Sequence, residues 1–436
     1  GGKLASTGTT NVNITSGTVT DTFGGGKSAN VTVKANVTAN GATINNNIYG
    51  GSDQSGTVKE TLVIIRQGAP QNVYGGNNLG GTATTTTVNI QGGNSGNVYG
   101  GGYQAATTTS NVNLTNGTIA NGFGGGESAN VTTSNITLNG TQVTGNIYGG
   151  SNQEGTVTQS YVKVQNGTAT SVFGGNNVGG TTITSNVQVT GGTTVNIYGG
   201  GYEAVTETTN VQLSGGTITN GFGGGASADV TTKANITVVN GITINGNIYG
   251  GSDQEGTVTE TLVNINGGSP TNVYGGNNLG GTSILTNVNV TAGNPTNVYG
   301  GGYSASTETT NVNLTGGTIT NGFGGGESAD VTEKTNITLN GTNVTGNIYG
   351  GSNQAGTVAE TDVKIMQGTP AEVYGGNNLG GTATLTQVSI QGGTIPKVYG
   401  GGFQASTGTT NVNLIGGTVT NAFGGGASED VTTKAN

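Results

Sequence analysis

The chain repeats one short motif along its whole length, an aromatic residue followed directly by two glycines. Asn72-Val73-Tyr74-Gly75-Gly76 is a typical copy. The motif occurs 17 times, and neighbouring copies are only 24 to 27 residues apart. A fixed period of this length indicates a solenoid or repeat array, in which successive coils share one continuous core. The aromatic residues of the 17 copies are Phe23, Tyr49, Tyr74, Tyr99, Phe123, Tyr148, Phe173, Tyr198, Phe222, Tyr249, Tyr274, Tyr299, Phe323, Tyr349, Tyr374, Tyr399 and Phe423.

The copies fall into four coil types that follow one another in a fixed order. After the aromatic residue the first type reads Gly-Gly-Gly, the second Gly-Gly-Ser, the third Gly-Gly-Asn and the fourth Gly-Gly-Gly-Tyr or Gly-Gly-Gly-Phe. A full cycle of about a hundred residues therefore links Phe23 to Phe123. Because the glycines can form a tight bend, we predict that the aromatic residues mark the corners of the coils, first at Tyr49, Tyr74, Tyr99 and Phe123.

Between the corners, apolar and polar residues alternate as they do in half-buried β-strands. Val88-Asn89-Ile90 places two branched residues on one side of an extended segment, and Gly92-Gly93 then marks a turn. Two or three short strands in about 25 residues predict an all-β fold, a parallel β-helix with coils ~4.8 Å apart. A β-propeller fits less well, since each blade needs ~40–50 residues. We expect residues 1–436 to form one continuous solenoid, a segment of a longer repetitive chain.

Composition is consistent with this architecture and excludes two others. Charged residues are only 7% and hydrophobic residues 30%, which raises the question of disorder, but the apolar residues are periodic. Glycine is 90 of 436 residues, yet it falls in pairs and triplets and not in the collagen period. In a solenoid, the asparagines before the corner aromatics, such as Asn72 and Asn97, are expected to hydrogen-bond from coil to coil. Glu60, Glu260 and Glu360 recur once per cycle, which we expect to limit repulsion between like charges.

The sequence offers little chemistry for catalysis or cofactor binding. There is no His and no Cys, so we expect no enzyme, no catalytic residue and no cofactor. Because parallel β-helices host polysaccharide lyases, a lyase-like enzyme with a charged cleft is the enzymatic alternative. We expect no metal site either, since Gly50-Gly51-Ser52-Asp53 departs from the calcium-binding nonapeptide pattern. The net charge is −9 without a basic cluster, and no apolar run is long enough for a membrane span, so nucleic-acid and transmembrane partners are not expected.

A second aromatic column occurs only in the fourth coil type, at Tyr103, Tyr202, Tyr303 and Phe403. These rings can pack against a corner of the coil and have only a structural role. Alternatively, they form a row of exposed rings, ~19 Å apart, that contacts a glycan or a neighbouring fibre. They are the candidate ligand-contact residues of the chain.

The Asn-Val-Tyr-Gly-Gly-Gly unit at 97–102, together with Gly-Gly-Thr-Ile/Val-Thr stretches such as 215–219, resembles the glycine-rich repeats of large bacterial surface adhesins and autotransporter-like β-solenoids. The resemblance implies a rigid protein outside the cell, at its surface. We therefore predict a non-enzymatic fibre or adhesin stalk that self-associates end to end and meets a host surface or glycan. The alternatives are a carbohydrate-binding solenoid that uses the exposed aromatic column, and an ice-binding solenoid with a flat threonine face.

Overall fold

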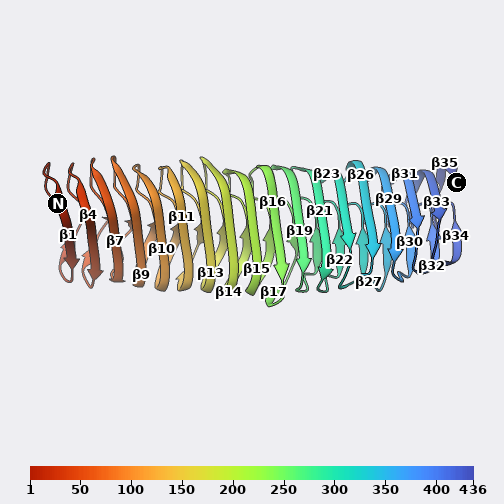
Figure 1. The fold of residues 1–436 in the computed structure, drawn as a ribbon, viewed down its shortest axis with the longest axis horizontal. Helices are drawn as coiled ribbons and strands as arrows, with labels where there is room; N and C mark the ends of the chain where they lie inside the picture. The colour runs from red at the N-terminus through yellow and green to blue at the C-terminus, as the bar shows by residue number, and fades with distance from the viewer. The chain divides into compact units, whose positions relative to one another are not determined.

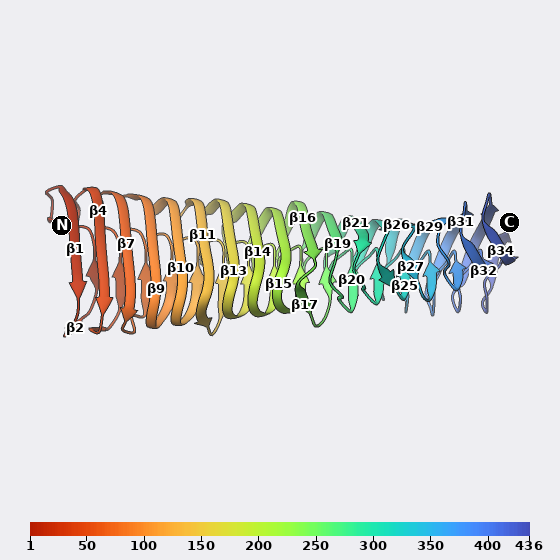
Figure 2. The ribbon, with the colours of Figure 1, turned by 60° about the horizontal axis from the view of Figure 1, so that its bottom comes forward.

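The computed structural model describes residues 1–436 and contains β-strands, turns and loops but no helix. The chain divides into two compact units, Gly1–Thr217 and Ile218–Asn436. Within each unit, successive strands pair in parallel with the coils before and after, which confirms the predicted parallel β-solenoid (Figures 1 and 2). The continuity of one solenoid across residues 1–436 stays a prediction. No segment forms a helix with the length and apolar character needed to cross a membrane.

The strands of the first unit belong to coils of similar length. They are β1 (Thr7–Ile14), β2 (Thr18–Val19), β3 (Thr22–Phe23), β4 (Val31–Asn40), β5 (Thr43–Ile44), β6 (Asn47–Tyr49), β7 (Thr57–Gln67), β8 (Asn72–Tyr74), β9 (Thr82–Tyr99), β10 (Ala106–Phe123), β11 (Val131–Val143), β12 (Asn146–Tyr148), β13 (Thr156–Phe173) and β14 (Thr181–Tyr198). The boundary between the units lies within β15 (Val205–Phe222).

The second unit repeats the same alternation of long and short strands. They are β16 (Val230–Val239), β17 (Ile242–Ile244), β18 (Ile248–Tyr249), β19 (Thr257–Asn266), β20 (Asn272–Tyr274), β21 (Thr282–Ala292), β22 (Asn297–Tyr299), β23 (Ser306–Leu314), β24 (Thr318–Ile319), β25 (Asn321–Phe323), β26 (Val331–Asn340), β27 (Asn343–Val344), β28 (Asn347–Tyr349), β29 (Thr357–Gln367), β30 (Glu372–Tyr374), β31 (Thr382–Ile390), β32 (Thr394–Tyr399), β33 (Ser406–Leu414), β34 (Thr418–Phe423) and β35 (Val431–Ala435).

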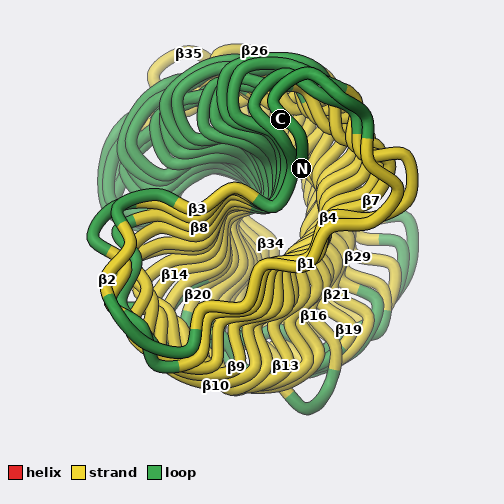
Figure 3. Tube along the Cα trace, turned by 90° about the vertical axis from the view of Figure 1, so that its left-hand side faces the viewer, coloured by secondary structure: helices red, strands yellow, loops and turns green.

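One coil consists of a long strand, a turn, a short strand and a loop. In the coil of β7 and β8, the turn between the strands contains Gly68, whose φ of 116° is accessible to glycine and strained for other residues. The loop begins at the glycines after Tyr74 and leads into the next long strand, β9. Seen from the N-terminal end, these loops of the first unit lie together on one side of the coil (Figure 3). The register is kept from coil to coil, with Val63 beside Val88 and Tyr74 beside Tyr99.

The core follows the period-two pattern of the long strands. In β7, Val58, Val63 and Ile65 are fully buried. Ile64, which lies between the last two, is partly exposed, and Arg66 after them is exposed. The asparagine ladder predicted before the corner is also present. Asn72 Nδ2 donates to Asn47 Oδ1 at 3.0 Å, and Asn121 Nδ2 donates to Asn97 Oδ1 at 3.0 Å. Stacked carboxamides therefore add side-chain hydrogen bonds to the backbone ladder between coils.

A column of buried Thr and Ser hydroxyls holds the long strand against the corner of the same coil. Thr61 Oγ1 donates to the carbonyl oxygen of Gly75 at 2.5 Å, and Thr261 Oγ1 donates to that of Gly275 at 2.6 Å. Both threonines are at most 2% exposed. Each hydroxyl thus supplies a hydrogen-bond donor to a backbone carbonyl at the buried corner, where buried polar groups need a partner. The equivalent donors in other coils are Thr10, Thr86, Ser110, Ser134, Ser160, Ser185, Thr286, Thr310, Thr335, Thr361, Thr386 and Thr410.

The third residue after the corner aromatic is glycine in the first and fourth coil types, serine in the second and asparagine in the third. In the third coil type Asn77 is fully buried. Its Oδ1 accepts the backbone N–H of Ser52 at 2.9 Å, and its Nδ2 donates to the carbonyl of Gly56 at 2.9 Å. A Cβ added to Gly51 would lie 1.9 Å from Asn77 Oδ1, and one added to Gly102 would lie 2.5 Å from the Asn77 carbonyl oxygen. The Asn77 side chain therefore requires glycine at position 51, and the backbone carbonyl of Asn77 requires glycine at position 102.

The hydroxyl column predicts a specific loss of stability. Thr261→Val keeps the side-chain shape but leaves the buried Gly275 carbonyl without its donor, so we expect local stability to fall by about 1–3 kcal/mol. Amide hydrogen exchange of the β19 coil measures this loss directly, because a repeat array can open one coil at a time. Thr257→Val, at an exposed position of β19, is the matched control. Equal protection in the two variants would contradict the bracing role.

Candidate functional site

The corner aromatics form a continuous stack inside each unit. In the first unit, neighbouring rings from Phe23 to Tyr198 have centroids 4.6–5.0 Å apart and planes within 9° of parallel. In the second unit, the stack from Phe222 to Phe423 has spacings of 4.7–5.0 Å and angles up to 13°. Tyr74 is only 3% exposed, and Val73 before it is also buried. The bend at the following glycines lets adjacent residues both enter the core.

The phenol hydroxyls of this stack meet polar side chains of the corner loops. Tyr74 donates to Glu127 Oε2 at 2.5 Å, and Tyr274 donates to Glu327 Oε2 at 3.0 Å. In each case the carboxylate belongs to a coil two further along the chain. Asn152 Nδ2 donates to the hydroxyl of Tyr99 at 3.2 Å. Because the phenols of Tyr74, Tyr99 and Tyr274 each have a polar partner, these tyrosines combine ring packing with hydrogen bonds.

Burial shifts the titration of these phenols to higher pH. Burial, followed by the negative charge of Asp21 and further nearby acidic groups, raises the pKa of Tyr49 to about 12. The pKa of Tyr74 is also raised, first by burial and then by the hydrogen bond to Glu127, which favours the protonated phenol. Burial and the charge of Glu327 raise the pKa of Tyr274 in the same direction. These three phenols therefore stay neutral well above the pH at which a free tyrosine ionises.

The candidate contact rings Tyr103, Tyr202, Tyr303 and Phe403 lie against this stack and also face solvent. They pack edge to face on Tyr74, Phe173, Tyr274 and Tyr374, with centroids 5.7–5.8 Å apart and interplanar angles of 67–81°. Tyr202 is 41% exposed and Tyr303 39%, whereas Tyr103 and Phe403 are half-buried. Each of these rings therefore packs against the corner of the coil with one part and is accessible to solvent with another. Their contact with a ligand stays a prediction.

Outward threonines align across four successive coils of the first unit. One exposed threonine from each of β9, β10, β11 and β13 occupies the same register position, between residues that pair from coil to coil. The four are Thr84, Thr108, Thr132 and Thr158. Lys59 occupies this position in the coil before, and Ile183 occupies it in the coil after. The flat threonine face required by the ice-binding alternative is therefore limited here to a patch of four coils.

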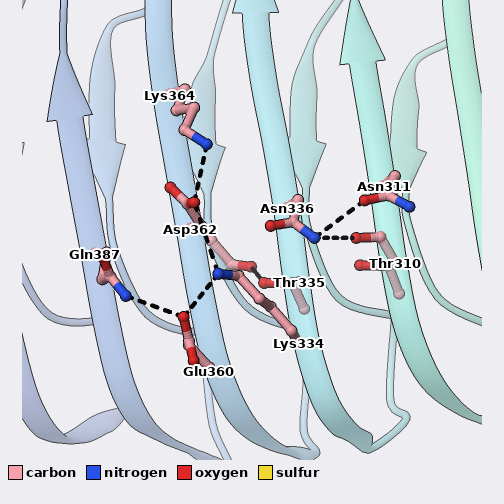
Figure 4. Close-up of polar contacts among 10 residues, drawn as sticks. Thr310, Asn311, Lys334, Thr335, Asn336, Glu360, Asp362, Lys364 and Gln387 are labelled. Carbon is pink, nitrogen blue, oxygen red and sulfur yellow. Dashed lines mark hydrogen bonds and ion pairs between the residues drawn. The ribbon is translucent and has the colours of Figure 1, made fainter.

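Charged side chains pair between neighbouring coils on the outer face of the long strands. Lys334 Nζ lies 2.8 Å from Glu360 Oε1 and 3.8 Å from Asp362, and Lys364 lies 3.1 Å from Asp362 (Figure 4). The hydrogen bond to Glu360 raises the pKa of Lys334. Glu260 pairs with Lys233 at 2.7 Å. The once-per-cycle glutamates are therefore not isolated charges, because each has a lysine in the preceding coil.

Lysine and glutamate change together along this column. In the second cycle, the equivalent paired positions are Thr133 and Gln159, so both charges are missing at once. The remaining pair, Lys34 and Glu60, is looser, with an N–O distance of 3.8 Å. Replacing both members of the ion pair by neutral residues leaves no unpaired charge at this position of the sheet surface.

The sequence reasoning missed an open groove in the loop region of the first unit. It has a volume of about 960 Å³, and its lining includes Gln104, Ser128, Gln153, Glu154 and Val178. Four of these residues occupy the same loop position in four successive coils. In the sequence, the variability of the residues after the corner glycines was the signal that could have indicated this groove. Only the path of the loops shows which of these side chains line the groove together.

Raised phenol pKa values predict a loss of stability at alkaline pH. The unfolded chain releases tyrosine protons near pH 10, whereas Tyr49 holds its proton to about pH 12, so this stability is present below pH 10 and is lost as pH rises toward 12. Denaturant unfolding across this range, with tyrosinate absorbance as a second reading, tests the effect. Tyr49→Phe should flatten the pH dependence. Ionisation of Tyr49 near pH 10 while the fold persists, seen as the difference in tyrosinate absorbance between the unchanged chain and Tyr49→Phe, would contradict its place in the buried stack.

The lysine column predicts a small, salt-sensitive contribution to stability. A double-mutant cycle with Lys334→Ala and Glu360→Ala should give a coupling of up to about 1 kcal/mol, since the pair is partly exposed. Added salt should reduce the coupling. Thr133→Ala with Gln159→Ala is the neutral control, and its unfolding should show no coupling that varies with salt. A coupling that persists in high salt would argue for a buried pair.

The acidic side chains of the chain do not gather into a metal site. No group of three or more His, Cys, Asp or Glu side chains lies close enough together to hold an ion. Asp53 and Asp253 each accept a carboxamide hydrogen bond instead, from Asn78 at 2.9 Å and Asn278 at 2.7 Å.

In comparisons with known proteins, no family model matches the chain, and neither a curated protein nor a solved structure was found to be similar.

Proposed function

We propose that the chain is a non-enzymatic structural element, the stalk or fibre of an extracellular surface protein. The observation that carries the proposal is the uninterrupted stacking of corner rings in each unit, from Phe23 to Tyr198 and from Phe222 to Phe423. Within each stack, every ring between the two end rings contacts the ring of the coil before and the ring of the coil after. Bending a unit would separate rings and hydrogen-bonded strands on its outer side, so the packing supports stiffness along the coil axis.

Further contacts support the same mechanical role. The Asn47–Asn72 and Asn97–Asn121 hydrogen bonds, together with the backbone pairing, connect each coil to its neighbours. The hydroxyl of Thr61 connects strand and corner within one coil. These hydrogen bonds together keep the backbone in paired strands. A protease can cleave only a segment that has opened locally, so we expect cleavage to be slow. Length, stiffness and protease resistance are the properties that a stalk needs outside a cell.

We extend the proposal to end-to-end association and to a cell-surface adhesin. The terminal coil of any parallel β-solenoid has one unpaired strand edge, which can pair with another copy. The adhesin assignment rests on the resemblance of the aromatic-glycine repeats to those of bacterial surface adhesins. Low charge supports close association of copies, since few like charges would meet at such a junction.

Electron microscopy of the native material tests the proposal. The expected result is continuous filaments at the cell surface with an axial repeat of ~19 Å, four coils of ~4.8 Å each. Antibody labelling of intact, unpermeabilised cells provides the control for location, with permeabilised cells as the comparison. Isolated short rods would count against filament formation, and labelling only after permeabilisation would count against an extracellular stalk.

A further inference from the structure

The groove in the first unit runs along the coil axis between two rows of side chains. One row is Gln104, Ser128, Gln153 and Val178, which occupy the same loop position in four consecutive coils. The opposite row includes Asn130 and Thr156, at the start of the following long strands. Four coils span three spacings of about 4.8 Å, so the groove extends at least ~14 Å along the axis. Its donors and acceptors therefore repeat at the spacing of the coils.

A second hollow extends the groove over the outward threonines. It has a volume of about 340 Å³ and shares Asn130 and Thr156 with the larger groove. Thr108, Thr132 and Thr158 line it and are exposed. The two hollows together present carboxamides on one side and hydroxyls on the other. Such groups both donate and accept hydrogen bonds, as a ligand rich in hydroxyls requires.

The groove side chains differ from the asparagine ladders in their hydrogen bonding. Asn72 and Asn121 use their carboxamides to contact the next coil. The carboxamides of Gln104 and Gln153 are exposed and make no hydrogen bond within the protein. Asn130 uses its Oδ1 to accept the backbone N–H of Thr156 at 2.8 Å, which leaves its amino group directed to no protein acceptor. These polar groups are free to bind a ligand without breaking contacts between coils.

Charge and apolar surface narrow the class of ligand. Glu154 is the one ionisable side chain in the lining of the two hollows, and neither contains a Lys or Arg. An anionic polymer would therefore meet a carboxylate and no cation. Val178, 43% exposed, supplies an apolar surface among the amides. A sugar ring has both kinds of surface, an apolar C–H face and hydroxyls around its edge.

We propose that this groove binds a neutral oligosaccharide that lies along the coil axis. Carboxamides of Gln104 and Gln153 hydrogen-bond successive sugar hydroxyls, Val178 packs on a ring face, and the threonine hollow receives the sugars that follow. A repeating polymer fits because its hydroxyls recur along the chain as the groove side chains recur along the axis. This binding function goes beyond the stalk, which the ladders maintain without it.

Calorimetric titration of the full chain with cellohexaose, maltohexaose and xylohexaose tests the proposal. At least one neutral hexamer is expected to bind. Gln104→Ala with Gln153→Ala should weaken its binding about tenfold, since two hydrogen bonds are removed. The matched control is Gln165→Ala with Gln188→Ala, two exposed glutamines outside the groove, and its affinity should equal that of the unchanged chain. Circular dichroism verifies the fold of both double variants.

Three results would overturn the glycan proposal. They are no binding of any of the three neutral hexamers, equal weakening in the groove and control variants, and tighter binding of a galacturonate hexamer than of the best neutral one. Filaments of the groove variant are expected to form as before. Loss of binding with intact filaments separates this inference from the structural function, and absence of filaments from the unchanged chain would affect the structural function alone.

Discussion

The close approach of coils at the aromatic-glycine corner is the constraint on which the rest of the structure depends. A Cβ on Gly75 would lie 2.2 Å from the carbonyl oxygen of Gly100 in the next coil, so any larger residue would force the coils apart. The same approach brings Tyr74 and Tyr99 to 4.7 Å, where parallel rings make good contact. Backbone pairing, ring stacking and the asparagine ladder share one spacing, and glycine at the corner allows all three.

This constraint also explains the four-coil cycle. Charge was one reason expected from the sequence, but Lys233 and Glu260 form a pair at 2.7 Å, so repulsion is already compensated locally. The loop interior gives a stronger reason. Fully buried Asn77 satisfies backbone groups of its own coil and of the coil before, and it leaves no room for side chains at Gly51 and Gly102. A side chain at position 102 would meet the backbone carbonyl of Asn77, so an asparagine cannot occupy the equivalent loop position of the next coil.

The sequence could predict what depends on period and alternation. The spacing of the aromatics predicted coils of about 25 residues, and the alternation in Val88-Asn89-Ile90 predicted the inward face of the strands. The inward position of Tyr74 could not be deduced, because strict alternation places it opposite Val73 and only the bend reverses this. The Thr61 hydroxyl was overlooked although Thr61 shares the period-two phase of Val63; a polar residue in that phase was the signal. The groove depends on loop paths, which no local pattern encodes.

Satisfied and free polar groups divide the molecule into a part that holds it together and a part that can bind. Along the ladders, polar side chains such as Asn97 contact the next coil, so a ligand there would have to break the contacts that keep the coils in register. Gln104 and Gln153 are in loops whose backbone is already paired, and their side chains contribute nothing to the stacking. They can change without loss of the fold. A repeat protein can therefore acquire recognition at such positions while its corners remain fixed.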